Sequence, residues 1–209
     1  MNTTLKTLSI TAALAASLGL AGCAASPGSG SMPMDHGTSG SMASSMPGAT
    51  ALASTGADHN QADVMFAQMM IPHHAQAVEM SGIILAKPDM PAELTALATR
   101  IKAAQAPEIE QMTGWLTGWN APTMMADHSG HGMSGMVDDA GIDKLRSATG
   151  TEAARLFLEQ MIGHHEGAID MAQQELSAGK SEDAVKLARG IVDAQQSEIT
   201  HMKQLLATL

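Results

Sequence analysis

The chain has 209 residues, with 21 acidic residues against 11 Lys and Arg, so its formal net charge is −10 with neutral histidines. The sequence has no basic patch of the kind that binds nucleic acid, so we expect no nucleic-acid partner. Aromatic residues contribute only 2% of the chain whereas there are 18 methionines, so any core must be built mainly from Leu, Ile, Ala and Met.

The N-terminus predicts an export signal. Lys6 is the only early charge, and the apolar run from Leu8 to Leu20 is too short to span a bilayer. The run leads into Leu20-Ala21-Gly22-Cys23, which looks like a bacterial lipobox, in which small residues admit the signal peptidase and the thiol receives a diacylglycerol. We therefore expect a lipoprotein signal peptide over 1–22 and lipidation at Cys23. An ordinary secretory signal that happens to contain a cysteine is the alternative.

These features predict a protein that is exported and anchored by its lipid to the cell envelope, facing the periplasm or the cell exterior. Its only membrane contact would be the lipid. Cys23 is the single cysteine, so the mature protein would have no disulfide and would depend on core packing. Residues 23–57 are rich in Ser, Gly, Ala, Pro and Met, a composition typical of a disordered tether. Residues 58–209 are numerous enough for one domain.

An internal repeat organises this domain. Residues 66–80 match residues 157–171 in their Phe, Met-Ile, His-His, Ala and Met positions, and residues 97–112 match residues 187–202. Each copy is therefore a helical hairpin. We assign repeat one to 58–119, a Met/His-rich loop to 120–150 and repeat two to 151–209.

Turn and capping residues set the expected helix boundaries. The first helix should run from about Asn60 to Ala86, and the second should begin at Pro91, after a turn at 87–89, and end near Trp119. The third should cover 151–178 and the fourth should start at Ser181 as its N-cap. Two short turns and one long connection predict an all-α four-helix bundle. Pro107 is expected to kink the second helix, so the number of helices could exceed four.

Helical periodicity predicts which residues face the core. Glu79 and Asp170 fall on the outer side of their helices, whereas the second and fourth helices place Gln and Glu residues among apolar neighbours. A buried carboxylate is costly unless it is paired, and imidazoles on the facing helix are the expected partners. The inward stripes are Phe66, Met70, His73, Ala77, Met80 and Ile84, with Phe157, Met161, His164, Ala168 and Met171; His74 and His165 flank them, and the polar residues facing them are Gln105, Glu108, Gln195 and Glu198.

A histidine on an apolar stripe is usually a core residue, and a methionine stripe is usually simple packing. Here paired histidines, flanking methionines and an inward glutamate occur together in both copies, which favours a ligand site, although shared ancestry of the copies would give the same agreement. Pro72 and Gly163 each precede a histidine pair, and helix-weakening residues often mark functional sites. A helix that simply begins at Pro72 is the alternative.

Thioether and imidazole together suit copper, with cuprous copper favoured, better than calcium or magnesium. Because imidazole must lose its metal as it is protonated, binding should weaken in acid. The candidate metal ligands are His73, His74, Met70, Met80, Met112, His164, His165, Met161, Met171, Met202 and His201, with Glu108, Glu198, Gln105 and Gln195 supporting them.

The expected tether and loop have the same bias in composition. We interpret them as auxiliary, low-affinity copper-collecting segments, with compositional drift as the alternative. The residues concerned are Met32, Met34, His36, Met42 and Met46 in the tether, and Met124, Met125, His128, His131, Met133 and Met136 in the loop.

The pattern Phe, Met-Ile-x-His-His, Ala-(Val/Ile)-x-Met, followed by Leu-Ala-x-x-Ile, Gln-x-x-Glu-Ile and Met, resembles the bacterial family catalogued as domain of unknown function 305. The resemblance covers about Asp58 to Leu209. It implies a ferritin-like bundle, and members of the family have been linked to copper binding and copper tolerance outside the cytoplasm. The motif positions of the family fall on His73-His74, His164-His165, Met80, Met171, 105–112 and 195–202.

Three functions compete. The first is a copper-binding protein that sequesters copper or passes it to a copper-handling protein partner, without catalytic turnover. The second is a di-iron oxidase or ferritin-like protein with iron as cofactor, suggested by Glu198-x-x-His201, although Gln111 replaces the histidine in the first copy. The third is a metal-free structural or interaction lipoprotein with a buried hydrogen-bond network. The Met/His-rich loop argues against the third function, because a metal-free protein gives no reason for its composition.

Overall fold

The structure of the protein, a computed structural model, describes residues 58–124 and 133–209. Within these ranges the chain forms four long helices, one short helix and no strand. They are α1 (Gln61–Leu85), α2 (Ala92–Gly118), α3 (Asp139–Ser147), α4 (Gly150–Ala178) and α5 (Glu182–Leu206). No helix in the described part is long and apolar enough to cross a membrane. The predicted signal peptide, the tether with its Met and His residues, Cys23, Met125, His128 and His131 lie outside the described residues.

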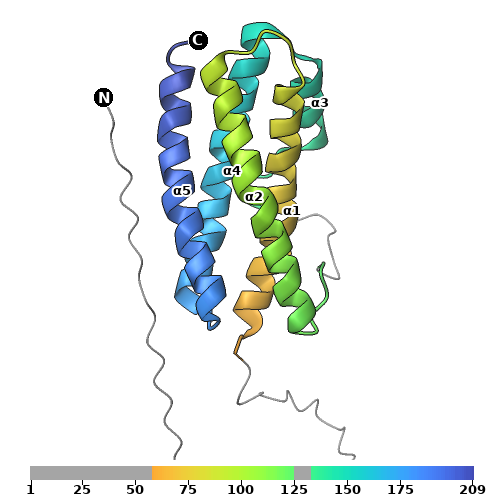
Figure 1. The fold of residues 1–209 in the computed structure, drawn as a ribbon, viewed down its shortest axis with the longest axis vertical. Coiled ribbons are helices and arrows are strands. Elements are labelled where there is room, and N and C mark those ends of the chain that lie inside the picture. Colours follow the sequence, from red (N-terminus) through yellow and green to blue (C-terminus); the bar gives the residue numbers. More distant parts are fainter. Residues whose placement is uncertain (1–57, 125–132) are drawn as a thin grey trace, which may run out of the picture. The chain divides into compact units, whose positions relative to one another are not determined.

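The four long helices form a bundle of two hairpins (Figure 1). α1 packs along α2, α4 packs along α5, and the two hairpins meet mainly through α1 and α4, which run in opposite directions. The expected all-α four-helix architecture built from two repeats is confirmed. α1 and α4 are therefore the helices that bring the two copies of the His-His motif together.

The prediction of a continuous loop over 120–150 was wrong in its second half, because α3 lies there. Asp138 caps α3 through a side-chain bond to the Gly141 N–H, and Ile142 and Leu145 are buried against the bundle. Two further bonds fix the segment: Gln160 donates to the Gly141 carbonyl, and Arg146 pairs with Glu79. The short helix thus covers α1 and α4 on one side.

Both internal prolines lie within unbroken helices. α1 continues through Pro72 and α2 continues through Pro107, so the fifth helix is α3 and is not the product of a break at Pro107. The alternative in which a helix begins at Pro72 is likewise wrong. α2 begins at Ala92, one residue later than expected, with Pro91 as its N-cap, and Ser181 caps α5 as predicted.

The start of α1 is joined to the turn between α4 and α5. Asn60 and Asp63 form a capping box, and Asp63 also accepts bonds from the backbone N–H groups of Lys180 and Ser181, both at 2.9 Å. Burial alone would raise the pKa of Asp63, but the Glu175 carboxyl and these N–H groups hold it below its usual value. Burial, followed by the neighbouring Asp63, raises the pKa of Glu175 to about 8.

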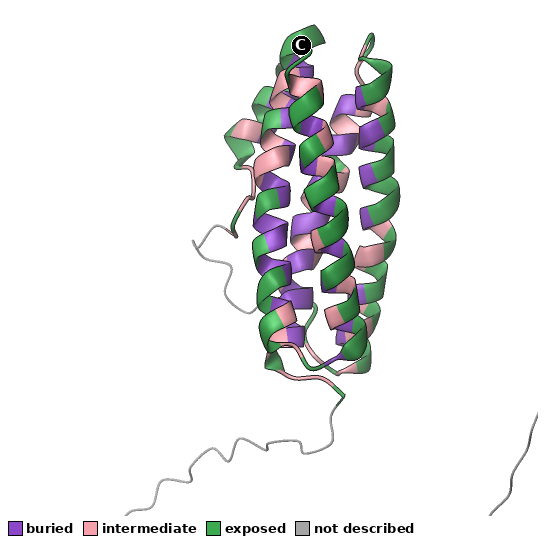
Figure 2. Ribbon diagram, turned by 90° about the vertical axis from the view of Figure 1, so that its left-hand side faces the viewer, coloured by how far each residue is buried: buried purple, intermediate pink, exposed green. Residues whose placement is uncertain are grey.

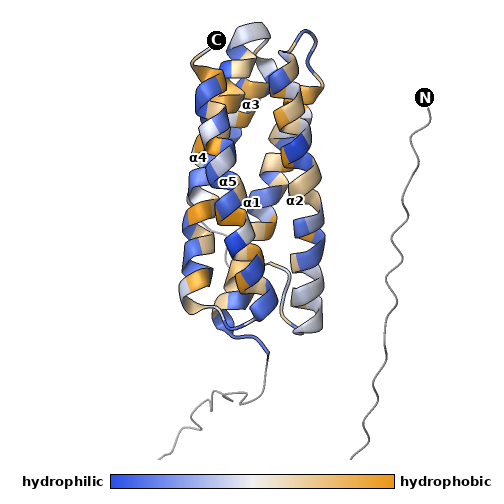
Figure 3. Cartoon of the chain, turned by 60° about the vertical axis from the view of Figure 1, so that its left-hand side comes forward, coloured by the Kyte–Doolittle hydropathy of each residue, from blue (hydrophilic) through white to orange (hydrophobic). Residues whose placement is uncertain are grey.

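The core consists of two apolar clusters, and buried residues follow the inner faces of the helices (Figure 2). Polar residues lie along the outer faces of α2 and α5 (Figure 3). One cluster contains Met80, Ile84, Leu97, Ile101, Phe157, Met161 and Met202. The other contains Phe66, Met70, Met112, Leu116, Ala168, Met171 and Ile191.

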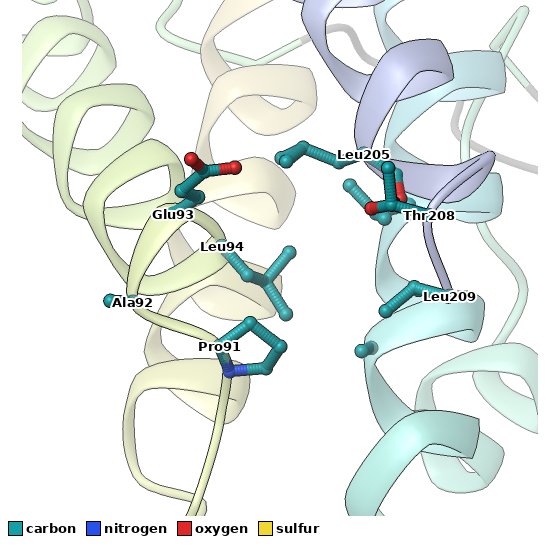
Figure 4. A pocket seen from close by; sticks show the side chains of 9 residues that line it. Pro91, Ala92, Glu93, Leu94, Leu205, Thr208 and Leu209 are labelled. Atoms are coloured by element: carbon teal, nitrogen blue, oxygen red, sulfur yellow. The ribbon is translucent and has the colours of Figure 1, made fainter.

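An apolar cavity of about 170 Å³ opens between the start of α2 and the end of α5. Pro91 and Leu94 face Leu205 and Leu209 across it (Figure 4). None of the predicted metal ligands lines this cavity. The search for a functional site therefore turns to the polar residues between the two core clusters.

Candidate metal centre

Four histidines lie together at the centre of the α1–α4 interface. His73, His74, His164 and His165 are at most 1% exposed. On α1, Met70 one turn before the pair belongs to one core cluster, and Ala77 one turn after it belongs to the other. α4 shows the same division in reverse, with Met161 in one cluster and Ala168 in the other. The histidine layer therefore separates the two apolar halves of the bundle.

The contact between the two helices is made by His73 and His164. Their ring centroids are 3.7 Å apart and the rings are inclined by 37°. Burial, followed by the neighbouring His74, lowers the pKa of His73 to about 3. Burial, followed by His73, lowers the pKa of His164 to about 2. Both imidazoles are therefore neutral near pH 7 and have a nitrogen lone pair available.

The other two histidines are each bonded to a glutamate from the partner helix of their own hairpin. His74 Nε2 lies 2.7 Å from Glu108 Oε2, and His165 Nε2 lies 2.7 Å from Glu198 Oε2. A carboxylate only accepts, so in each pair the imidazole donates its Nε2–H. The inward positions predicted for both glutamates are confirmed, with their side chains 26% and 22% exposed.

This donor arrangement leaves the other nitrogen of each ring as a lone-pair site. Nδ1 of His73, His74 and His165 and both nitrogens of His164 are buried without a hydrogen-bond partner in the described structure. Native proteins satisfy nearly all buried polar atoms, so five unpartnered ring nitrogens in one layer require an explanation. Four of the five have a lone pair, because one nitrogen of the neutral His164 ring has a proton, and a metal ion that accepts these four lone pairs would supply an explanation.

The predicted methionine ligands are divided evenly on the two sides of the layer. All six are at most 5% exposed. Met70, Met112 and Met171 belong to one cluster, and Met80, Met161 and Met202 belong to the other. The repeat relates the two sets, because Met70 corresponds to Met161, Met112 to Met202 and Met80 to Met171. Thioethers are therefore available at both faces of the histidine layer.

Three other predicted residues have different surroundings. Gln105 and Gln195 are 3% exposed, and the Oε1 atom of each has no partner among the described residues, which agrees with their predicted inward positions. His201 lies apart, half-buried, with Nδ1 3.4 Å from an Arg100 nitrogen. A guanidinium disfavours a second cation nearby, so we leave His201 out of the centre.

Residues 133–137, within the predicted Met/His-rich loop, lie directly on the centre. The Ser134 carbonyl accepts a bond from His73 Nε2 at 3.2 Å. Gln76 holds the same segment with two bonds of 2.8 Å to the N–H and carbonyl of Val137. Met133 and Met136 of this segment are half-buried, whereas Met124 is 68% exposed. The structure thus brings two of the auxiliary methionines close to the histidine layer in the fold.

The close approach of this segment depends on Gly167. A Cβ built there would lie 2.0 Å from the Ser134 carbonyl oxygen, a backbone atom that cannot move alone. We expect Gly167→Ala to displace residues 133–137 and to destabilise the protein by about 1–3 kcal/mol, measured by urea unfolding. Gly163→Ala is the matched control, because its Cβ would meet nothing within 4 Å. It should be neutral or slightly stabilising, since alanine favours helix. Equal effects of the two changes would contradict this account.

Within residues 58–124 and 133–209, no three His, Cys, Asp or Glu side chains are grouped so that they alone could hold one metal ion. A preformed centre at this layer would therefore need thioethers besides imidazoles. The described residues do not assemble the carboxylate-rich set of a di-iron site, since Glu79 and Asp170 are exposed on the outer faces of their helices.

Sequence reasoning missed the contribution of residues 133–137 because the His73 partner is a backbone carbonyl, which has no side-chain signature. A signal was nevertheless present. Gln76 and Gly167 occupy equivalent positions of the repeat, and they differ because one clamps the segment and the other leaves room for it. The difference between the two copies at this position coincides with the place where the connection docks.

Comparison with known proteins places this site in a family. The model of the domain of unknown function DUF305 matches residues 63–206. A putative secreted DUF305 protein from Streptomyces coelicolor is 39% identical, with a TM-score of 0.67 over 70% of this chain and 93% of that one. A DUF305 fragment from Deinococcus radiodurans is 32% identical, with a TM-score of 0.66 over 72% and 98%.

A third solved structure, CopM in a Cu(II)-bound form, is 36% identical, with a TM-score of 0.60 over 70% of this chain and 96% of that one. No curated protein matches the sequence. The family match covers all four long helices and both His-His pairs, and these relatives span the same bundle. The chain therefore belongs to the DUF305 family.

Proposed function

We propose that this protein is an extracytoplasmic copper-binding protein that sequesters copper or passes it on, with the four-histidine layer and its flanking methionines as the binding centre. The observation that carries the proposal is the state of His74 and His165. Each donates Nε2–H to a glutamate and keeps Nδ1 buried without a partner. Carboxylate–histidine pairs of this kind orient the ring and raise its basicity in metal sites.

The composition of the layer favours copper over harder metals. Neutral imidazole suits several transition metals, but thioethers on both sides of the layer select soft ions, cuprous copper above all. CopM, a relative with the same bundle, has been solved in Cu(II)-bound, Cu(I)-bound and silver-bound forms. The ligands we propose are His73, His74, His164 and His165 together with Met70, Met80, Met112, Met161, Met171 and Met202.

The location that we propose follows from the N-terminus. Lipidation at Cys23 would hold the bundle at the cell envelope through a tether over 23–57. A relative described as a putative secreted protein supports an extracytoplasmic place. The methionines and histidines of the tether and of the connecting loop would collect copper with low affinity, and Met133 and Met136 would lie at the end of that path.

Elemental analysis after metal loading tests the function. Residues 24–209 are incubated with copper, iron or zinc, desalted and analysed. We expect copper alone to be retained, and we expect a variant with His73, His74, His164 and His165 all changed to alanine to lose tightly held copper while it stays helical by circular dichroism.

His59→Ala is the matched control, because this histidine stacks on Trp119 with ring centroids 4.6 Å apart and is not part of the layer. It should retain copper as the unchanged chain does. Retention of iron by the unchanged chain would instead favour the di-iron interpretation. If no metal survives desalting, the layer is a structural hydrogen-bond network and the proposal is wrong.

A further inference from the structure

A second methionine cluster, away from the histidines, lies between the start of α1 and the end of α4. It lines a cavity of about 120 Å³. Met65 and Met69 come from α1, and Met171 and Glu175 come from α4. Residues four apart lie on the same face of a helix, so each pair presents its two side chains to this cavity. Three thioethers and one carboxyl thus line a single small cavity.

Exposure decreases from the surface to the floor of this cavity. Met65 is 40% exposed, Met69 is half-buried, Met171 is 5% exposed and Glu175 is 1% exposed. Met65 is one of only three exposed large apolar side chains among the described residues. The cluster therefore extends from solvent into the bundle, as an entry path for a small ion requires.

The carboxyl of Glu175 is buried beside Asp63, and it lowers the pKa of that carboxylate. Burial, followed by Asp63, raises the pKa of Glu175 to about 8, so Glu175 is protonated near pH 7 and can donate its O–H to Asp63. Asp63 also accepts bonds from three backbone N–H groups, those of Asn60, Lys180 and Ser181. Glu175 therefore helps to join α4 to the start of α1, and its side chain also lines the cavity.

The internal repeat provides a direct comparison. The positions equivalent to Met65, Met69 and Glu175 are occupied by Leu156, Gln160 and Ile84, and only Met171 has a methionine counterpart, Met80. Ile84 is fully buried in the core, so an apolar side chain satisfies the same place in the other half of the bundle. Inheritance from the repeat therefore does not explain the two methionines that α1 contributes to the cavity.

We propose that Met65, Met69, Met171 and Glu175 form a second binding site for a soft monovalent cation, either cuprous or silver ion. Thioether sulfur is a soft donor that binds such ions and has little affinity for Mg²⁺ or Ca²⁺. Methionine has three rotatable side-chain bonds, so three sulfurs from two helices can converge on one ion without movement of the backbone. The site contains no histidine, and it shares only Met171 with the ligands proposed for the copper centre above.

Silver titration of the full chain tests this site, with Cys23→Ala to remove the thiol and methionine methyl groups labelled with carbon-13. We expect the methyl signals of Met65, Met69 and Met171 to shift on addition of silver nitrate, both in this chain and in the variant that lacks the four central histidines. We expect Met65→Leu with Met69→Leu to retain one silver ion fewer per chain after desalting, while Cu(II) retention is unchanged. Glu175→Gln should bind silver more weakly.

Met90→Leu is the matched control, because this half-buried methionine packs against the other core cluster and should leave the silver content unchanged. The site is refuted if the Met65 and Met69 signals do not move, or if the double leucine variant retains as much silver as the unchanged chain. Equal silver binding by Glu175→Gln would remove the carboxyl from the site. If the unchanged chain binds silver and the variant that lacks the four central histidines binds none, this second site is refuted and the four-histidine centre remains supported.

Discussion

Lowering the pH from about 7 to about 4 is expected to remove several kcal/mol of folding stability from the metal-free protein. The cause is the buried pair His73 and His164, whose pKa values burial lowers to about 3 and about 2. In the unfolded chain both imidazoles titrate near a pKa of about 6.5. At pH values between the folded and the unfolded pKa values, these two imidazoles are protonated in the unfolded state and neutral in the folded state.

The direction follows from linkage. Stability rises with pH wherever the unfolded state holds more protons, so the contribution of these histidines is complete above about pH 6.5 and is lost as the pH falls toward 3. Each group can change the free energy of unfolding by at most about 1.4 kcal/mol per pH unit. Two such groups are significant against a typical domain stability of about 5–15 kcal/mol.

Urea unfolding followed by circular dichroism at pH 7, 6, 5 and 4 measures the effect. The matched variant has His73→Leu and His164→Leu. Each leucine fills the buried position with an apolar side chain and removes the titrating group. The unfolding midpoint of this variant should change much less over this range than that of the unchanged protein. Parallel losses in the two proteins would show that protonation of these histidines does not control acid stability.

Much of this centre could be predicted from the sequence, because helical periodicity and the repeat act at the level of single residues. Every position of the two predicted inward stripes is buried, from Phe66 to Ile84 on α1 and from Phe157 to Met171 on α4. The His–Glu pairing followed from the cost of a buried carboxylate, and the distances of 2.7 Å confirm it.

The loop prediction over 120–150 was wrong, and His201 was left out of the proposed centre, at places where local pattern and tertiary contact differ. α3 has only Ile142 and Leu145 to bury, in a stretch rich in Asp, Gly and Ser, and it depends on the helices it covers. His201 has a favourable spacing from Glu198, but the neighbouring helix places Arg100 beside it. Neither outcome is encoded in the segment itself, since both depend on which element packs against it.

The glutamates of the histidine layer should affect copper affinity more than any other residues that are not themselves ligands. Glu108→Ala with Glu198→Ala leaves Nε2–H of His74 and His165 without its acceptor, so neither the tautomer nor the ring orientation is fixed. Loss of such an acceptor typically weakens metal binding by about 10–100-fold. Competition with a coloured cuprous chelator measures the change in affinity.

Two comparisons separate the causes. Glu108→Gln with Glu198→Gln retains a neutral oxygen that accepts the same N–H, so it should weaken binding less than the alanine pair. Glu79→Ala removes an exposed carboxylate that pairs with Arg146 on the outer face of α1, and its affinity should be unchanged. If the double alanine variant binds copper as tightly as the unchanged protein, Nδ1 of His74 and His165 does not hold the metal. The centre would then have to depend on the His73–His164 contact and the thioethers, because those are the remaining buried donors of the layer.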